Sequence, residues 1–276
     1  MTLIRVAHSP DSDDAFMFYA LAKDLIDTGS LRFEHVLADI ETLNREAFNG
    51  TYEVTAVSIH AYAHLDQRYA LLGSGASMGD GYGPVLVARE PADASQLEAM
   101  KVAIPGRLTS AALALKMWNP SLETVILRFD EIMPAVQSGE VDAGVVIHEG
   151  QLTWQDEGFA KIVDLGEWWA AETGGLPLPL GGNVIRRDLG EEVCRQSAAL
   201  LKASIEYSLA HRSRALDYAL DYGRGLDLDQ ADRFVGMYVN ELTVDYGERG
   251  RRAMSVFLER AFAEGLIPKV PQLDFL

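Results

Sequence analysis

The sequence of 276 residues predicts an α/β fold of two lobes with a ligand cleft between them. Three observations support this prediction. Short β-branched runs alternate with helix-period segments, which is typical of βαβ units and a largely parallel sheet. Glycine-rich segments interrupt the alternation at residues 73–83 and 174–182. The chain after the second segment is mostly helical, as expected if it returns to the first lobe.

The first lobe is predicted to contain strand–helix pairs at its start and a long helical portion at its end. The strands are expected at residues 4–7, 32–36 and 54–58, and the helices that follow them at 15–25, 41–48 and 61–65. A strand at 85–88 leads toward the change of lobe, and residues 183–185 form a return strand. The helices of the final portion are expected at 191–212, 213–222, 229–239 and 246–263.

The middle third of the chain is predicted to form the second lobe. Its strands are expected at residues 101–104, 124–129 and 143–147, and its helices at 109–118 and 131–137. The predicted domains are therefore residues 1–88 plus 183–276 for the first lobe and 89–182 for the inserted second lobe. Because the carboxyl ends of parallel strands face one crevice, polar residues at those ends are the candidate ligand contacts.

The composition disfavours nucleic acids and membranes as partners. Lys and Arg number 24 against 41 Asp and Glu, a net charge of -17 that repels nucleic acid and anionic membranes. Local groups in a cleft can still bind a small anion, so an anionic small-molecule substrate remains compatible. The single cysteine, Cys194, permits no intrachain disulfide and no cysteine-based metal site. No signal-peptide pattern or membrane-length apolar run is present, which predicts a cytoplasmic protein.

His148 is the candidate catalytic residue. It follows the apolar strand predicted at 143–147, so its side chain is expected to enter the crevice. An imidazole titrates near neutral pH and can accept a proton without a large change of pKa. An isolated histidine is more often structural. Glu149 could orient His148 or be only a surface residue, and the opposite directions of adjacent strand residues favour the second interpretation.

Neutral polar groups are expected around the same crevice. Ser58 ends the third strand and Asn44 lies in the second helix, where both could recognise a hydroxyl or carboxylate group. Ser9 follows the first strand and is another candidate substrate contact. The sequence contains no Gly-x-Ser-x-Gly elbow, so a serine hydrolase is not supported.

Two strand-to-helix connections are candidates for ion binding. In the first, Asp11, Asp13 and Asp14 precede a helix, where they are expected to cap it rather than to bind a metal. In the second, Arg107, Thr109 and Ser110 lie where helix N–H groups converge, which predicts a cradle for an anion or carboxylate. The alternative for the second connection is a simple helix cap. It matches neither a P-loop nor a dinucleotide fingerprint.

Motifs along nearly the whole chain resemble the menaquinone-biosynthesis enzymes of the futalosine route, and most closely the 1,4-dihydroxy-6-naphthoate synthases. The motifs that carry the resemblance are His8-Ser9-Pro10-Asp11-Ser12-Asp13-Asp14-Ala15-Phe16, Glu41-Thr42-Leu43-Asn44, Gly81-Tyr82-Gly83-Pro84, Ile147-His148-Glu149 and Tyr238-Val239-Asn240-Glu241-Leu242-Thr243. The resemblance implies the fold of type II periplasmic solute-binding proteins. It also implies a lyase that acts on cyclic dehypoxanthinyl futalosine without a cofactor.

The resemblance also implies roles for particular residues. His148 corresponds to the proton acceptor, the run Ala56-Val57-Ser58 to a strand end that contacts substrate, and Thr109-Ser110 to a helix start that does so. Two departures from the family's pattern imply that an anionic ligand is held differently here. Many members carry Ser-Pro-Cys-Pro-Asn-Asp at residues 9–14, and a lysine often stands where this chain has Ala56.

Two alternative functions stay open at this point. A non-catalytic solute-binding protein for a small organic anion would share the fold and use the same cleft. The sister enzyme of the same route, which dehydrates chorismate, would share much of the sequence pattern. Fold alone does not separate a catalyst from a receptor.

Overall fold

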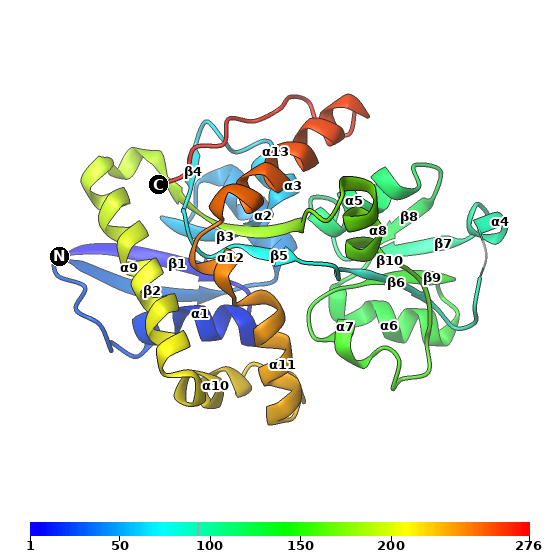
Figure 1. Ribbon diagram of the computed structural model, residues 1–276, viewed down its shortest axis with the longest axis horizontal. Coiled ribbons are helices and arrows are strands. Elements are labelled where there is room, and N and C mark those ends of the chain that lie inside the picture. Colours follow the sequence, from blue (N-terminus) through cyan, green and yellow to red (C-terminus); the bar gives the residue numbers. More distant parts are fainter. Residues whose placement is uncertain (93) are drawn as a thin grey trace.

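The computed structural model describes residues 1–92 and 94–276, which form two α/β lobes, each built on its own sheet (Figure 1). The predicted two-lobed α/β fold is confirmed. The six-stranded sheet runs β2-β1-β3-β11-β4, with β5 paired to β11, and contains β1 (Thr2–His8), β2 (Leu31–Leu37), β3 (Val54–Ser58), β4 (Tyr69–Leu71), β5 (Ser77–Gly79) and β11 (Leu178–Arg186). The five-stranded sheet runs β10-β6-β9-β7-β8 and contains β6 (Val85–Ala88), β7 (Lys101–Ile104), β8 (Glu123–Ile126), β9 (Ala143–Val146) and β10 (Ala160–Asp164).

Helices cover both sheets. The first lobe carries α1 (Ser12–Ala22), α2 (Ile40–Asn49), α3 (Ile59–Tyr62), the 3-10 helix η1 (Arg187–Leu189), α9 (Glu191–Ala210), α10 (Arg212–Leu220), α11 (Leu228–Tyr238), α12 (Glu241–Val244) and α13 (Gly247–Ala263). The second lobe carries α4 (Ala94–Leu97), α5 (Ser110–Trp118), α6 (Phe129–Ser138), α7 (Gly150–Thr153) and α8 (Leu165–Thr173). Among the described residues, no helix has the length and apolar character needed to cross a membrane.

Helix α1 forms the centre of the first lobe. Its residues Ala15, Phe16, Met17 and Phe18 are all buried, and the helix packs against α9 and α10. A helix that is apolar on every side is stable only when other elements surround it. Asp11 begins this helix, since its carboxylate accepts a hydrogen bond from the Asp14 N–H at 3.3 Å. Burial of α1 therefore fixes the loop between β1 and the helix at the edge of the sheet.

Two segments near the predicted lobe boundaries lie in a different sheet from the one expected. β6 pairs with β9 and β10 in the five-stranded sheet, whereas residues 1–88 are predicted for the first lobe. Residues 178–182 of β11 pair with β3 and β5 in the six-stranded sheet, whereas 89–182 are predicted for the second. Apart from these segments, the division of the chain into domains stays a prediction.

The prediction of largely parallel sheets is also wrong for these connecting strands. β11 runs antiparallel to β3, β4 and β5, and β6 runs antiparallel to β9 and β10. Parallel pairs remain where a crossover helix joins the strands, as for β1 with β2 and β7 with β8. A strand that enters from the other lobe has no such crossover, so either direction is available to it.

His8, the last residue of β1, is buried in an environment that disfavours its charge. Its ring stacks on Phe18 with centroids 4.5 Å apart, and its Nε2 lies 3.2 Å from Nδ1 of His35. Burial, and then the charge of His35, lower the pKa of His8 to about 4 from the ordinary value of 6.5. The folded protein therefore keeps His8 neutral over a range in which the unfolded chain would protonate it.

This lowered pKa predicts a loss of stability in mild acid. Between pH 6.5 and 4 the unfolded state binds more protons at His8 than the folded state does. The contribution of neutral His8 to the free energy of unfolding is therefore complete above pH 6.5 and falls as the pH approaches 4. The loss should reach about 3 kcal/mol of the free energy of unfolding. We expect urea unfolding at pH 7 and pH 4.5 to show a smaller pH difference for His8→Phe than for the wild type. Equal pH differences in the two proteins would contradict this assignment.

Candidate functional site

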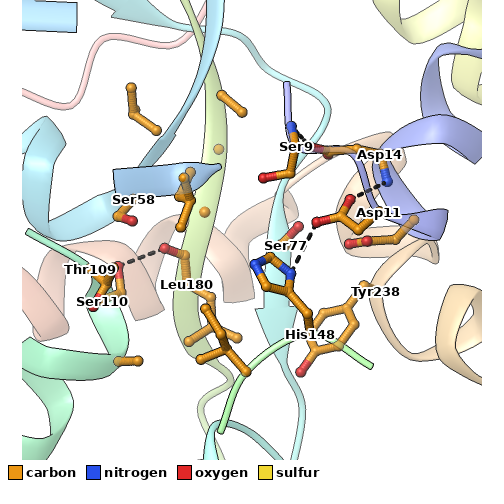
Figure 2. Close-up of a pocket in the computed structure, with 18 of the residues that line it drawn as sticks. Ser9, Asp11, Asp14, Ser58, Ser77, Thr109, Ser110, His148, Leu180 and Tyr238 are labelled. Atoms are coloured by element: carbon orange, nitrogen blue, oxygen red, sulfur yellow. Dashed lines mark hydrogen bonds and ion pairs between the residues drawn. The ribbon is translucent and has the colours of Figure 1, made fainter. Parts of the chain in front are cut away.

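The principal cleft lies between the two lobes and receives residues from both (Figure 2). The empty volume between its walls, including space open to solvent, is about 730 Å³. The polar residues that line it are Ser9, Asp11, Asp13, Asp14, Ser58, Ser77, Thr109, Ser110, His148, Gln151, Asn183 and Tyr238. Among the lining residues, in the part of the chain that the structure describes, none is Lys or Arg. An anion in this cleft would therefore depend on dipoles rather than on a cationic side chain.

His148 enters the cleft from the loop after β9. Its backbone has φ 55°, the left-handed region, which costs a non-glycine residue about 1–2 kcal/mol. The ring packs edge-on against Phe129 with centroids 5.0 Å apart, and its Nδ1 lies 3.0 Å from Oδ2 of Asp11. Surrounding contacts thus hold the imidazole in one orientation, in a backbone conformation that would otherwise be unfavourable.

Asp11 is the partner that orients this imidazole. Burial alone would raise the pKa of Asp11, but hydrogen bonding to His148 and the charges of His148 and Arg224 lower it to about 2. An ionised carboxylate can only accept, so the Nδ1 atom of His148 carries the hydrogen that they share. Figure 2 shows the other ring nitrogen turned away from Asp11, toward the middle of the cleft. In the neutral imidazole, that nitrogen carries the lone pair that can take a proton.

Asp13 and Asp14 complete a group of acidic side chains beside this pair. Asp14 accepts a hydrogen bond from the Ser9 N–H at 2.8 Å, while Oδ1 of Asp13 is buried with no partner among the described residues. Burial, and then neighbouring carboxylates, raise the pKa of both Asp13 and Asp14 well above the usual value. Close carboxylates cannot all ionise, so Asp11 holds its charge while the other two tend to stay protonated.

These carboxylates are also the one possible metal-binding group found in the described residues. Ligand atoms of Asp11, Asp13 and Asp14 lie within 4.8 Å of one another. Asp11 is already held by His148 and the Asp14 N–H, and Asp14 by the Ser9 N–H. The carboxylates thus act in a hydrogen-bond network around the histidine, and the expectation of no metal stays a prediction.

The opposite wall of the cleft is built from hydroxyl groups and the start of α5 (Figure 2). The Thr109 hydroxyl caps the helix by accepting from the Ala112 N–H at 3.2 Å and donates to the Gly106 carbonyl at 2.9 Å. The Ser110 hydroxyl donates to the Leu180 carbonyl at 2.6 Å. Both hydroxyl protons are therefore used within the fold.

Backbone amides of the same helix are left for a ligand. Within residues 1–92 and 94–276, no acceptor takes the N–H of Ser110 or of Ala111. Both residues line the cleft at the positive end of the helix dipole. The anion cradle stays a prediction, and the groups left for an anion here are these amides rather than the two hydroxyl protons.

Ser58 and Asn44 form a fixed pair at this wall. The Asn44 side chain donates from Nδ2 to the Ser58 Oγ at 3.1 Å and accepts from the Ser58 N–H at 2.9 Å. Asn44 is fully buried and does not line the cleft, so it positions Ser58 rather than facing a ligand. Across the described chain, no acceptor takes the Ser58 hydroxyl proton, so a ligand can receive it.

The remaining sequence candidates divide into two groups. Ser9, Ala56 and Val57 line the cleft as expected. Arg107 does not: its side chain is exposed and lies outside the residues that line the cleft. Its position in a turn two residues before the helix cap directs it to the surface, so the expectation that it contacts substrate is not supported by its placement.

Several cleft residues were not singled out from the sequence for a function. Tyr238 of α11 lies with its hydroxyl 2.6 Å from the side-chain amide of Gln151, which belongs to α7 in the other lobe. Ser77 and Asn183 come from β5 and β11. Tyr238 begins one of the motifs that carry the family resemblance, and this was the one available signal. The others depend on strand pairing between distant segments.

A cleft between two α/β lobes, with an oriented histidine on one wall and helix amides on the other, defines a two-lobed protein that binds small molecules. Solved structures agree with the two-lobed fold. The alkanesulfonate-binding protein SsuA of Xanthomonas axonopodis, bound to MOPS, has a TM-score of 0.73 at 13% identity, covering 99% of this chain and 96% of that one. This likeness concerns the fold alone.

The chain belongs to the menaquinone biosynthesis family, whose model matches residues 4–263. It is 41% identical to the 1,4-dihydroxy-6-naphthoate synthase of Thermus thermophilus, with 100% of both chains covered. It is 38% identical to the synthase of Streptomyces coelicolor, covering 96% of this chain and 95% of the relative. The crystal structure of protein AF1704 from Archaeoglobus fulgidus has a TM-score of 0.92 at 49% identity, covering 96% of this chain and 98% of that one. The resemblance seen in the sequence is confirmed, and the chain is an enzyme of menaquinone biosynthesis.

Proposed function

We propose that this enzyme is a carbon–carbon lyase that converts cyclic dehypoxanthinyl futalosine to 1,4-dihydroxy-6-naphthoate. The name of the Thermus thermophilus and Streptomyces coelicolor relatives supports this product. The observation that carries the chemistry is the His148 imidazole, held by the ionised Asp11 at 3.0 Å with its second nitrogen toward the cleft. Such a pair is suited to removing a proton from a bound substrate.

In this proposal, the free nitrogen of His148 takes a proton from the spirocyclic substrate. The electron pair left by that proton then drives cleavage of a carbon–carbon bond in the ring system, and the part of the substrate that is not naphthoate leaves as the second product. The proton on His148 returns to a product or to water, and the gain of aromaticity in the naphthoate favours the products. Asp11 stabilises the imidazolium that forms and keeps the ring aligned. The reaction as proposed needs no cofactor, since proton transfer and fragmentation leave the overall oxidation state unchanged.

The distribution of charge in the cleft supports one orientation of an anionic substrate. The wall that contains the ionised Asp11 repels a carboxylate, whereas the amides of Ser110 and Ala111 at the start of α5 attract one. A substrate carboxylate at α5 would leave the rest of the ring system extending toward His148. The small anionic substrate, the cytoplasmic location and the lack of nucleic-acid or membrane partners stay predictions of the sequence.

The proposal is tested by incubating the purified protein with cyclic dehypoxanthinyl futalosine and following naphthoate formation by liquid chromatography with mass detection. We expect multiple turnovers without an added cofactor. Tight binding of the compound without turnover would support the solute-binding alternative. Dehydration of chorismate, with no naphthoate formed, would support the sister enzyme.

Ser58→Ala tests the wall of hydroxyl and amide groups. Loss of the free hydroxyl donor is expected to raise KM about tenfold, the usual effect of removing one hydrogen bond to a charged group, with little change in kcat. Arg107→Ala is the control, because its exposed side chain lies outside the cleft, and it should leave KM within about twofold. Steady-state kinetics measure both. A larger effect on KM from Arg107→Ala than from Ser58→Ala would contradict this arrangement.

A further inference from the structure

Arg224 lies in the loop between α10 and α11 of the first lobe, at the edge of the cleft. Its backbone has φ 47°. Within the described residues, the non-glycine residues with positive φ are Arg224, His148 and Asp24. Two members of this set therefore occur at the same site. A left-handed backbone at a non-glycine residue persists only where contacts around it hold it in place.

The guanidinium of Arg224 contacts both lobes beside the catalytic pair. Toward the first lobe, its Nη2 donates to the Pro10 carbonyl at 2.7 Å. Toward the second, its Nη1 donates to Oε2 of Glu149 at 2.8 Å, and its Cζ lies 4.5 Å from the centroid of the Phe129 ring. Pro10 precedes Asp11 and Glu149 follows His148, so one side chain ties together the two segments that carry the pair.

The His148–Asp11 pair itself spans the two lobes. Asp11 follows β1 of the six-stranded sheet, and His148 follows β9 of the five-stranded sheet. A separation of the lobes at this edge would therefore lengthen the 3.0 Å contact between Nδ1 and Oδ2. Glu149 is buried, with its side chain 7% exposed, and Arg224 is its ion-pair partner. Among the described residues, loss of the cation would leave this carboxylate with only a 3.5 Å hydrogen bond from the Ser12 N–H.

We propose that Arg224 is a positioning residue that aligns His148 with Asp11 by joining the two lobes at the edge of the cleft. The inference deepens the proposed function and rests on it for the activity measurement only. Arg224 contacts Pro10, which precedes Asp11, and Glu149, which follows His148. It also contacts Phe129, whose ring packs against His148. These contacts are expected of a residue that holds the two segments together. Arg224 does not line the principal cleft, so its effect on substrate affinity should be small.

Arg224→Ala, Arg224→Lys and a matched control test the proposal. Arg212 is the control, because like Arg224 it forms an ion pair, with Asp232, and lies over an aromatic ring, that of Phe16. Unlike the partners of Arg224, both of these residues belong to the first lobe. We expect Arg224→Ala to lower kcat about 30-fold with KM changed less than threefold, and Arg224→Lys, which cannot make the forked contacts, to recover only part of kcat. Arg212→Ala should leave kcat within about twofold.

Two measurements without substrate separate this inference from the proposed function. In Arg224→Ala, small-angle X-ray scattering should give a larger radius of gyration, and NMR should show loss of the hydrogen-bonded Nδ1 proton of His148. Arg212→Ala should show neither change. These changes in a protein that forms no naphthoate would sink the proposed function and leave the positioning role intact. Scattering, NMR and kcat for Arg224→Ala that match Arg212→Ala would overturn the positioning role.

Discussion

Replacing His148 by Asn should lower kcat by about 10³-fold, the usual contribution of a positioned general base. Asn has no group that can accept a proton near neutral pH, so the step that starts the fragmentation is lost. Asn also tolerates the left-handed backbone found at this position, and its amide can still donate to Asp11. The fold and the affinity for substrate should therefore change little.

The measurement is naphthoate formation under saturating substrate, together with thermal unfolding to confirm that the variant is folded. His64→Asn serves as a control, since this exposed histidine lies on the surface away from the cleft and its replacement should leave kcat within about twofold. Turnover by His148→Asn at the wild-type rate would remove this residue from the mechanism.

Asp11→Asn should lower kcat by about 10²-fold or more, because the amide can favour the wrong tautomer of His148. The carboxylate of Asp11 accepts the Nδ1 hydrogen, whereas the NH₂ group of Asn can donate to Nδ1 and force the hydrogen onto Nε2. The base would then be blocked although its position is unchanged. The variant should also show a changed pH dependence of kcat, which a purely structural role for Asp11 would not produce.

Asp13→Asn provides the comparison for Asp11→Asn. Asp13 is also buried, but its raised pKa indicates that it tends to carry a proton, so an uncharged amide is a closer substitute there. We expect a much smaller loss of kcat in this variant, measured by the same assay. A loss at Asp13→Asn equal to that at Asp11→Asn would indicate that the effect comes from disturbing the carboxylate group as a whole.

The local features of the fold could be predicted from the sequence, whereas long-range pairing could not. Short continuous apolar runs located β1, β3, β7 and β9, because burial on both faces of a strand leaves a clear β-branched signal. The same signal says nothing about the direction in which a strand enters its sheet. For this reason the antiparallel pairing of β6 and β11 was missed, and the residues near the lobe boundaries were assigned to the wrong sheet.

The candidate site shows the same division. His148 could be found because a polar residue directly after a buried strand is expected to face the crevice. Its partner Asp11 lies 137 residues earlier in the other lobe, and its role as the cap of α1 gave a sufficient local explanation of the carboxylate. Whether the hydroxyls of Thr109 and Ser110 are free for a ligand depends on the carbonyls beside them, which only the folded chain brings into place.

The most direct test of the account is ¹⁵N NMR of the enzyme with labelled histidine at neutral pH. The 3.0 Å contact between Nδ1 of His148 and ionised Asp11 predicts a hydrogen on Nδ1 and a bare Nε2. The Asp11→Asn variant should reverse this assignment. A native protein in which Nε2 of His148 carries the hydrogen while Nδ1 is bare would leave no lone pair toward the substrate, and the proposed proton transfer would be wrong.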